Sequence, residues 1–401
     1  MKKLFLISQV FYPDEVSTAG LFTNLCSLLT ERGYNVEVWA AQPAYSVRNR
    51  QPKSMIYSGI SISYLPSTNF PKTNIFGRIS NTLTFTASVC IKMLFSKDKT
   101  AVFTHTTPPL LGIVLSFICT IKKRKFVYIL LDIFPEGLVR LGKASNKNPL
   151  IRLWQMLFVA SLNRSEKIVV LGRDMKEWIL KIAPSSGEKV NYIPVWQNDK
   201  LVSPMDFSSN ELVREHNLQH KFVVQYSGNM GLWNEMKTIG MAVRMNLEEV
   251  VFMFVGGGIR KKELFDNFII EEQLNVIELP FQPESRLRSV LTACHVGLVT
   301  MKRGLEGIAV PCKIFGILAA GIPVIALVPE ESEIAMIIRE ENCGIVVDPS
   351  DLDGLHKAII KLKNDEQLRV IMGTNGRNAF TRKYSLNVIA EKYGELINSL
   401  I

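Results

Sequence analysis

The sequence lacks the features that mark disulfide-rich, zinc-binding and membrane-spanning proteins. Its 401 residues contain six cysteines with no Cys-x-x-Cys pair, so we expect neither a disulfide framework nor a zinc site, and a reducing compartment is favoured. No uncharged apolar stretch reaches about 18 residues, so no spanning helix is expected. The apolar start of the chain is too short for a signal peptide and is interpreted as a first strand.

Recognisable nucleotide and metal motifs are also missing. The glycine-rich segments 228–231 and 256–258 do not have the spacing of a Rossmann fingerprint, and there is no Walker A lysine. We identify no Asp-x-Asp pair behind a predicted strand that would hold a metal, so neither a metal nor a cofactor is expected. Cations at helix starts would then have to stabilise an anionic substrate.

Charge is plentiful but unevenly distributed. The net charge of +10 divides into +14 for residues 1–196, with 25 Lys and Arg against 11 Asp and Glu, and −4 for residues 197–401. The basic half favours an anionic partner. Nucleic acid is one candidate, but anionic lipid is favoured because the basic run 122–125 directly follows the apolar run 110–121. A merely basic surface is the alternative.

Strand-like and helix-like segments alternate along the chain. A strand at 4–8 is followed by a loop, a helix and a second strand at 36–40, which together form a right-handed parallel unit, and the pattern starts afresh with a strand at 222–226. We therefore predict an α/β fold with two doubly wound parallel sheets. The predicted parts are an N-terminal domain at 1–196, a C-terminal domain at 197–384, and a helix at 385–401 that packs back on the N-terminal domain.

Candidate ligand contacts in the first half follow predicted strands, because such sheets bind ligands at the carboxyl ends of their strands. Gly20 could approach a ligand where the first helix begins, although one glycine is more often a plain helix start. His105 ends a strand and is more often structural. Asp132 and Glu136 follow the next strand, and capping of a helix is the alternative role of Glu136. Arg173 opens a helix and suits an anion.

The stretch 306–325 organises the second half. Pro311 suits the first turn of a short apolar helix at 312–320, and Gly321 is a natural stop. Lys313 is the odd residue, because a cation in the first turn faces the positive end of the helix dipole. A bound anion would remove this conflict, whereas a solvated surface lysine is the alternative.

Two glycine-rich loops strengthen the case for an anion. The segments 228–231 and 256–258 each join a predicted strand to a predicted helix, and such loops can present N–H groups to a phosphate. Each loop alone is weak evidence. Together with Lys313, on neighbouring strands of one sheet, they indicate a site for a nucleotide diphosphate.

With these residues in view, the chain resembles a retaining nucleotide-sugar glycosyltransferase of family 4, in the branch that builds bacterial surface polysaccharides. The resemblance covers essentially the whole chain and implies the GT-B fold, in which two Rossmann-like domains face each other across a deep interdomain cleft. It is strongest in the segments 226–231, 254–258, 279–284 and 306–326, and is also present at 11–14, 132–136 and 193–195.

The resemblance implies that the second domain binds the donor. Gly228 and Asn229 would lie near the diphosphate, Lys313 would contact phosphate, and the backbone of Ala309 and Val310 would add N–H donors.

The remaining roles are also carried over from the resemblance. Glu306 would approach the sugar, and Phe281 and Gln282 would lie beside the base. Gly20 would approach the diphosphate from the opposite domain. Asp132, with Glu136, would line the acceptor side.

The chain departs from the family at several positions. The second glutamate of the family's Glu-x7-Glu pattern, a ribose ligand, would fall at position 316, which is Gly316. A basic pair would fall near Asn229 and Asn234, and a histidine just before position 132 is Leu131. Lys313 and Arg173 would then carry more of the phosphate charge.

These residues favour transfer of a sugar from a nucleotide diphosphate, UDP rather than GDP, to a lipid-linked saccharide, for O-antigen, capsule or exopolysaccharide. The enzyme would be cytoplasmic, peripheral at the inner face of the plasma membrane, and metal-independent. Retention would resemble front-face attack, with the leaving phosphate helping to deprotonate the acceptor. The alternatives are a sugar-nucleotide epimerase and a non-catalytic binding or chaperone subunit. Nucleic acid is not expected, because no aromatic-basic platform is evident.

Overall fold

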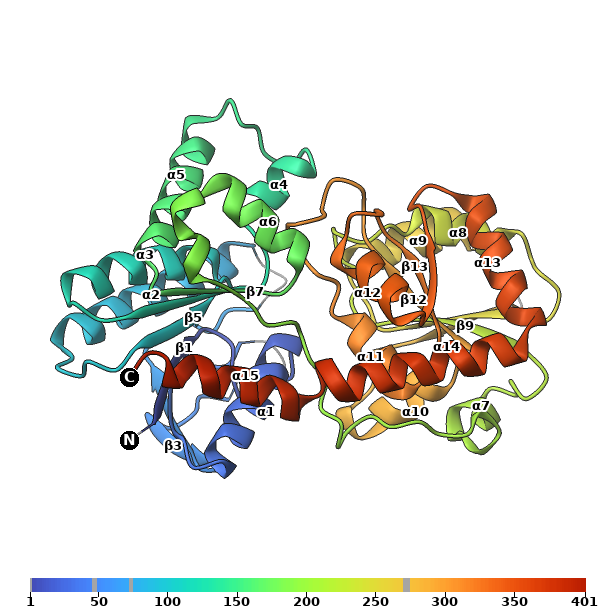
Figure 1. The fold of residues 1–401 in the computed structure, drawn as a ribbon, viewed down its shortest axis with the longest axis horizontal. Helices are drawn as coiled ribbons and strands as arrows, with labels where there is room; N and C mark the ends of the chain where they lie inside the picture. The colour runs from blue at the N-terminus through green and yellow to red at the C-terminus, as the bar shows by residue number, and fades with distance from the viewer. Residues whose placement is uncertain (1, 45–48, 72–74, 270–274) are drawn as a thin grey trace. The chain divides into compact units, whose positions relative to one another are not determined.

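The computed structural model describes residues 2–44, 49–71, 75–269 and 275–401. Two compact units divide the chain, the first comprising Met1–Pro194 with Leu386–Ile401 and the second Val195–Ser385. Each unit has a central sheet with helices packed against it (Figure 1). No helix in the described ranges combines the length and the apolar character needed to cross a bilayer.

In the first unit, the described residues form an eight-stranded sheet that is parallel except at one edge. Its order is β3-β4-β2-β1-β5-β6-β7-β8, and β3 runs antiparallel to β4. The strands in chain order are β1 (Lys3–Ser8), β2 (Asn35–Ala41), β3 (Ser54–Tyr57), β4 (Ile60–Leu65), β5 (Val102–His105), β6 (Phe126–Leu130), β7 (Lys167–Val170) and β8 (Val190–Tyr192).

The helices of the first unit include one from the far end of the chain, which packs against α1. They are α1 (Ser17–Glu31), α2 (Ile75–Phe95), α3 (Pro109–Ile121), α4 (Glu136–Arg140), α5 (Pro149–Arg164), α6 (Arg173–Ile182) and α15 (Leu386–Asn398). The sequence predicts the first two of these helices at 21–32 and 82–95, so both begin earlier than expected. Ser17 and Thr18 hid the first turn of α1, and glycine and polar residues within 77–82 interrupt the apolar pattern at the start of α2.

In the second unit, the described residues form a six-stranded sheet of order β11-β10-β9-β12-β13-β14, and every pair of strands is parallel. Its strands are β9 (Phe222–Ser227), β10 (Val250–Val255), β11 (Val276–Leu279), β12 (Val296–Thr300), β13 (Val324–Leu327) and β14 (Gly344–Val347). The two predicted parallel sheets are therefore present.

The helices of the second unit begin with one before β9 and end with two after β14, and the others lie between the strands in the chain. They are α7 (Glu211–Glu215), α8 (Lys237–Arg244), α9 (Ile259–Phe268), α10 (Leu287–Thr292), α11 (Lys313–Ala320), α12 (Glu333–Glu341), α13 (Leu352–Asn364) and α14 (Glu366–Ala379). The sequence predicts a helix at 234–245, but α8 begins only at Lys237, because Asn234 is used in the loop before it. Gly321 ends α11 with a φ of 72°, as its position after an apolar helix predicts.

The core of the second unit shows why its strands read as continuous apolar runs. In β10, Phe252 and Phe254 enter one apolar cluster, whereas Val251 and Met253 enter another. Side chains alternate between the two faces of a strand, so both faces of this sheet are covered. Because β10, β9 and β12 are parallel neighbours in the sheet, their carboxyl ends lie side by side.

We predict that Gly112→Ala destabilises the first unit by about 1–3 kcal/mol through overpacking. A Cβ atom at Gly112 would lie 2.3 Å from the ring of Tyr128, which is fully buried. The midpoint of urea unfolding, followed by circular dichroism, measures the effect. Gly20→Ala is the matched control, because a Cβ atom at Gly20 in α1 meets nothing within 4 Å. An equal loss in both variants would contradict the packing argument.

Candidate functional site

Lys313 lies at the first residue of α11 and reaches the first glycine loop. Its Nζ donates to the carbonyl oxygen of Asn229 at 3.0 Å and lies 5.2 Å from the ring centre of Tyr226. The Tyr226 hydroxyl donates to the same carbonyl oxygen at 3.0 Å. The structure therefore brings Lys313 and Asn229 together at the carboxyl end of β9.

Lys313 carries a charge that the protein does little to neutralise. Burial lowers the pKa of Lys313, and the nearby Cys312 opposes this shift. No ion pair between described residues involves Lys313. Its ammonium also lies at the positive end of the α11 dipole. An anion bound here would be stabilised by both the charge and the helix terminus.

Glycines let the two loops pack against each other. Gly228 has a φ of 115°, and a Cβ atom there would lie 3.1 Å from Cε of Lys313. A Cβ atom at Gly256 would lie 2.5 Å from the carbonyl oxygen of Gly228. A Cβ atom at Gly258 would lie equally close to Oδ1 of Asn229. Side chains at these positions would separate the loops and displace Lys313.

The hydrogen bonds of these loops revise the expected phosphate cradle. The N–H of Gly228 donates to Val255 at 2.7 Å, and the N–H of Met230 donates to Gly257 at 2.7 Å. These two donors hold the loops together and are not offered to a ligand. The loops therefore offer fewer free N–H groups to an anion than expected. An anion bound here would depend more on the Lys313 ammonium.

Asn234 and Tyr226 support this arrangement, although the sequence singled out neither as a contact. Oδ1 of Asn234 accepts from the N–H of Gly231 at 2.7 Å, and its Nδ2 donates to the carbonyl of Thr300 at 3.2 Å. Asn234 thus ties the first glycine loop to the end of β12. The sequence signal that could have indicated this role is an asparagine three residues after a loop glycine.

Phe281 lies beside the second glycine loop, as the resemblance implies for a residue next to the base. Cβ atoms at Gly256 and Gly257 would lie 3.2 and 3.3 Å from the ring of Phe281. The side chain is nonetheless 64% exposed, so one face of the ring is open. Gln282 instead donates from Nε2 to Pro280 in its own loop at 3.1 Å.

The loop before α11 holds the other predicted donor contacts. Ala309 and Val310 are buried and Glu306 is partly buried. Nine residues separate Glu306 from Gly316, so the two positions do not keep the seven-residue spacing of the family pattern. The position at that spacing is Ile314, which is fully buried.

Gly316 lies in α11, and a side chain at this position would press against a neighbouring helix. A Cβ atom there would lie 3.1 Å from Cδ1 of Leu291 and 3.7 Å from Nε2 of Gln197. Leu291 comes from α10, which packs against α11. Gly316 has no side chain to offer to a ribose, and a larger residue here would require Leu291 to move.

The remaining candidates belong to the first unit. Gly20 is the fourth residue of α1, and its N–H donates to Val16 within the helix, so it offers open space and not a donor. Arg173 is the first residue of α6, as predicted. Glu136 accepts from Arg140 at 3.4 Å and from Gln155 at 3.1 Å, which gives it a structural role.

His105 is structural in this protein. Its Nδ1 accepts from the backbone N–H of Thr107 at 3.2 Å, which leaves the proton on Nε2. Nε2 lies 2.8 Å from the Ser8 hydroxyl, which donates to Val10. Burial lowers the pKa of His105 to about 3. The neutral ring therefore fixes the loop after β1.

Contrary to the expectation that no Asp-x-Asp pair stands behind a strand, residues 351–353 form such a sequence after β14. Asp351 caps α13 by accepting from the N–H of Gly354 at 2.8 Å, and Asp353 is exposed beside Lys357. No group of three or more His, Cys, Asp or Glu side chains among the described residues is arranged to hold a metal ion. The sequence is a helix start.

Comparison with known proteins agrees with this geometry. The profile of the glycosyl transferases group 1 family matches residues 209–379. The probable glycosyltransferase WbjE of Pseudomonas aeruginosa is 26% identical over 343 residues, which cover 83% of this chain and 84% of that protein. The chain is a glycosyltransferase of the GT-B type.

Solved structures confirm the predicted GT-B fold. Sucrose-phosphate synthase from Thermosynechococcus elongatus matches with a TM-score of 0.74 at 17% identity, over 100% of this chain and 99% of that chain. Anabaena HepE in complex with UDP-glucose matches with a TM-score of 0.73 at 13% identity, over 99% of both chains. At this identity the likeness concerns the fold of the glycosyltransferase.

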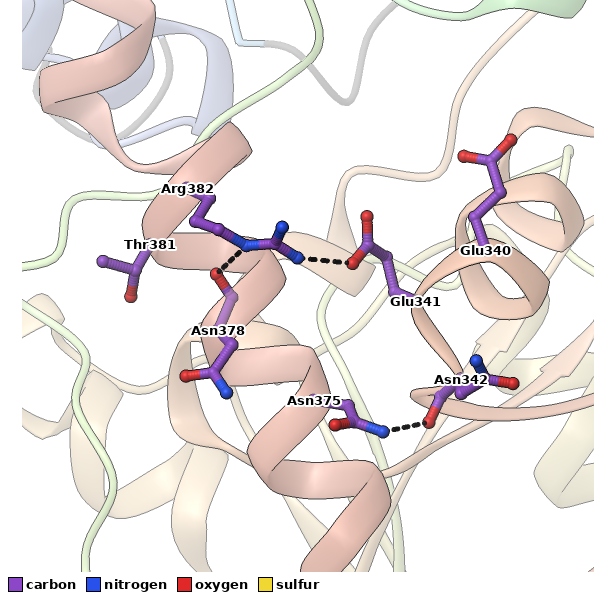
Figure 2. Close-up of a pocket in the computed structure, with 7 residues that line it drawn as sticks. All are labelled: Glu340, Glu341, Asn342, Asn375, Asn378, Thr381 and Arg382. Carbon is purple, nitrogen blue, oxygen red and sulfur yellow. Dashed lines mark hydrogen bonds and ion pairs between the residues drawn. The ribbon is translucent and has the colours of Figure 1, made fainter.

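An open polar pocket of the glycosyltransferase lies elsewhere in the second unit (Figure 2). Its lining comes from the end of α12, from α14 and from the helical turn 380–384 that follows α14. Arg382 pairs with Glu341 at 3.0 Å, and Asn375 donates to Asn342 at 3.2 Å. None of the predicted site residues lines it. The candidate site is therefore formed by Lys313 and the two glycine loops, and not by this pocket.

We predict that Asp132→Asn makes the glycosyltransferase relatively more stable as pH rises. Burial raises the pKa of Asp132 to about 6, so the folded state holds this proton through pH values where the unfolded state has lost it. Stability is therefore lost from about pH 4 to pH 6, by on the order of 2 kcal/mol. Urea unfolding across this range measures the difference.

Asp353→Asn is the control for this experiment, because Asp353 has an 83% exposed side chain. Its unfolding free energy should follow the wild-type pH curve. If the wild-type and Asp132→Asn curves stay parallel from pH 4 to pH 7, the Asp132 carboxyl is not perturbed as described.

Proposed function

We propose that this glycosyltransferase moves a sugar from a nucleotide diphosphate sugar to a lipid-linked saccharide in the synthesis of a bacterial surface polysaccharide such as O-antigen, capsule or exopolysaccharide. The observation that supports this most directly is the Lys313 ammonium at the start of α11, held 3.0 Å from the Asn229 carbonyl. Its charge has no paired carboxylate among the described ion pairs and favours a diphosphate. The matching relative, a probable glycosyltransferase, agrees with the activity.

Lys313 would act when the donor bond breaks. Negative charge then develops on the leaving diphosphate, and a positioned ammonium stabilises that charge more than it stabilises the ground state. The amino end of α11 would add to this field. With cations serving this purpose, the proposed reaction needs no metal.

The donor base would rest on the exposed face of the Phe281 ring, beside the second glycine loop. UDP is favoured over GDP. Solved neighbours in the same fold were captured with UDP and glucose, and one with a fluorinated UDP-glucose. Those ligands belong to the neighbours and support the choice of nucleotides to test here.

The remaining roles rest on the family 4 resemblance. Glu306 would approach the sugar, Asp132 would line the acceptor site, and Gly20 and Arg173 would contact the donor phosphates. Retention would proceed by front-face attack, in which the leaving phosphate helps to deprotonate the acceptor hydroxyl. The +14 charge of residues 1–196 supports work at the anionic inner face of the plasma membrane.

We predict that UDP binds to the wild type without added metal and that Lys313→Ala weakens this binding by about ten- to a hundredfold. A charge-assisted phosphate contact contributes about 1.5–3 kcal/mol, which corresponds to this range. Isothermal titration calorimetry with UDP and with GDP measures it. The proposal ranks UDP as the tighter ligand.

Lys357→Ala is the matched control, because Lys357 is an exposed lysine on α13 paired with Asp353. It should bind UDP like the wild type. If neither nucleotide binds to the wild type, the transferase assignment loses its basis and a non-catalytic binding subunit takes its place. If Lys313→Ala binds normally, the diphosphate lies elsewhere.

We also predict that Gly20→Ala lowers sugar transfer without lowering stability. Alanine in a helix is more stable than glycine by up to about 1 kcal/mol, and a Cβ atom at Gly20 has open space. A ligand that uses this space would be obstructed by the new methyl group. Release of UDP from the donor measures transfer, and unchanged transfer would remove Gly20 from the site.

A further inference from the structure

Helix α2 has two apolar faces. One consists of Phe85, Val89 and Met93, which recur at four-residue spacing and are fully buried. The other is open to solvent and has large apolar side chains along the whole helix. These are Ile79, Leu83, Ile91, Leu94 and Phe95, with exposed fractions of 51%, 57%, 60%, 48% and 83%. A helix that is apolar on both sides is expected where a second partner covers it.

Two neighbouring helices also have exposed large apolar side chains. Helix α3 packs against both α2 and α5, so the three form one layer (Figure 1). On α3, Leu110 and Ile121 are 43% and 73% exposed. On α5, Leu150, Leu153 and Met156 are 72%, 50% and 68% exposed. We call these ten side chains the α2–α3–α5 face.

The charge of these helices selects the partner. None of α2, α3 and α5 contains an Asp or a Glu. Cations lie at the edges of the apolar side chains: the Arg164 guanidinium stacks 4.1 Å from the Phe117 ring, and the Lys122 ammonium donates to the Leu94 carbonyl at 2.7 Å. Lys99 in turn donates to the Lys122 carbonyl at 2.9 Å. An apolar centre with a basic rim is complementary to an anionic lipid surface.

Other partners fit this face less well. In a symmetric dimer the same face meets itself, so the basic rim would oppose a basic rim with no acidic residue from these helices between them. Nucleic acid would use the cations but would leave the large aliphatic side chains in water. A lipid surface uses both the apolar centre and the cations.

We propose that the α2–α3–α5 face inserts shallowly into an anionic bilayer and holds the enzyme at the surface where a lipid-linked acceptor resides. This inference deepens the proposed function, because it names the part of the chain that contacts the membrane. The apolar side chains enter the boundary between headgroups and acyl chains, and the cations stay among the phosphates.

The first experiment measures sedimentation of the full chain with vesicles of phosphatidylglycerol and phosphatidylcholine in equal parts. We expect binding that high salt weakens but does not abolish, because apolar insertion is insensitive to screening. The triple variant Leu83→Ser, Ile91→Ser, Phe95→Ser should bind at least about tenfold more weakly. The matched control is Val370→Ser, Ile371→Ser, which alters exposed apolar residues on α14 and should bind like the wild type.

Nucleotide binding separates failure of this inference from failure of the proposed function. The triple variant should bind UDP like the wild type, which also shows that it folds. If wild type binds UDP but not anionic vesicles, the membrane inference is wrong and the transferase proposal stands. Equal vesicle binding by wild type and triple variant would also overturn the assignment of this face.

A second experiment reads the face directly. The fluorescence of Phe95→Trp should shift to shorter wavelength when the vesicles are added, because the new indole enters a less polar environment. Ile371→Trp, in the other unit, should show no such change. An unshifted Phe95→Trp spectrum on bound protein would overturn the inference. The inference would also be overturned if neither protein bound vesicles and sedimentation velocity showed a dimer for the wild type but not for the triple variant. The partner of this face would then be a second copy of the chain.

Discussion

The unneutralised ammonium of Lys313 at the start of α11 is the interaction on which the candidate site depends. It lies at the positive end of a helix, and its contacts are a carbonyl oxygen and the face of Tyr226. Such an arrangement has a cost in the empty protein that a bound diphosphate would offset. The nearby loops keep the ammonium in place, since Gly228 leaves room for the lysine side chain only because it lacks a Cβ atom.

The departures from the family motif become intelligible once this arrangement is seen. Leu291 of α10 lies beside the position of a Cβ atom at 316, and the residue at the family spacing from Glu306 is the fully buried Ile314. Asn234 is neutral, yet it fixes the glycine loop through two hydrogen bonds. The first glycine loop is thus held by neutral contacts.

The charges of the two halves of the chain differ in sign and in distribution. The second unit has a local cation in a mildly acidic half, whereas the other half is broadly basic and has the α2–α3–α5 face. A single lysine beside glycines would suit the proposed diphosphate, because geometry decides such a contact. A broad basic surface with apolar side chains suits a bilayer, which has no fixed geometry to match.

The sequence by itself determined the alternation of strands and helices and the parallel sheets, and it singled out Lys313 at the start of a helix, because apolar runs, glycines and helix ends are local signals. It also indicated a basic half that faces an anion. Only the tertiary structure showed that the N–H groups of Gly228 and Met230 are already used, that His105 is structural, and that α2 has an exposed apolar face. These facts depend on which distant segments pack together, and a one-dimensional pattern does not contain them.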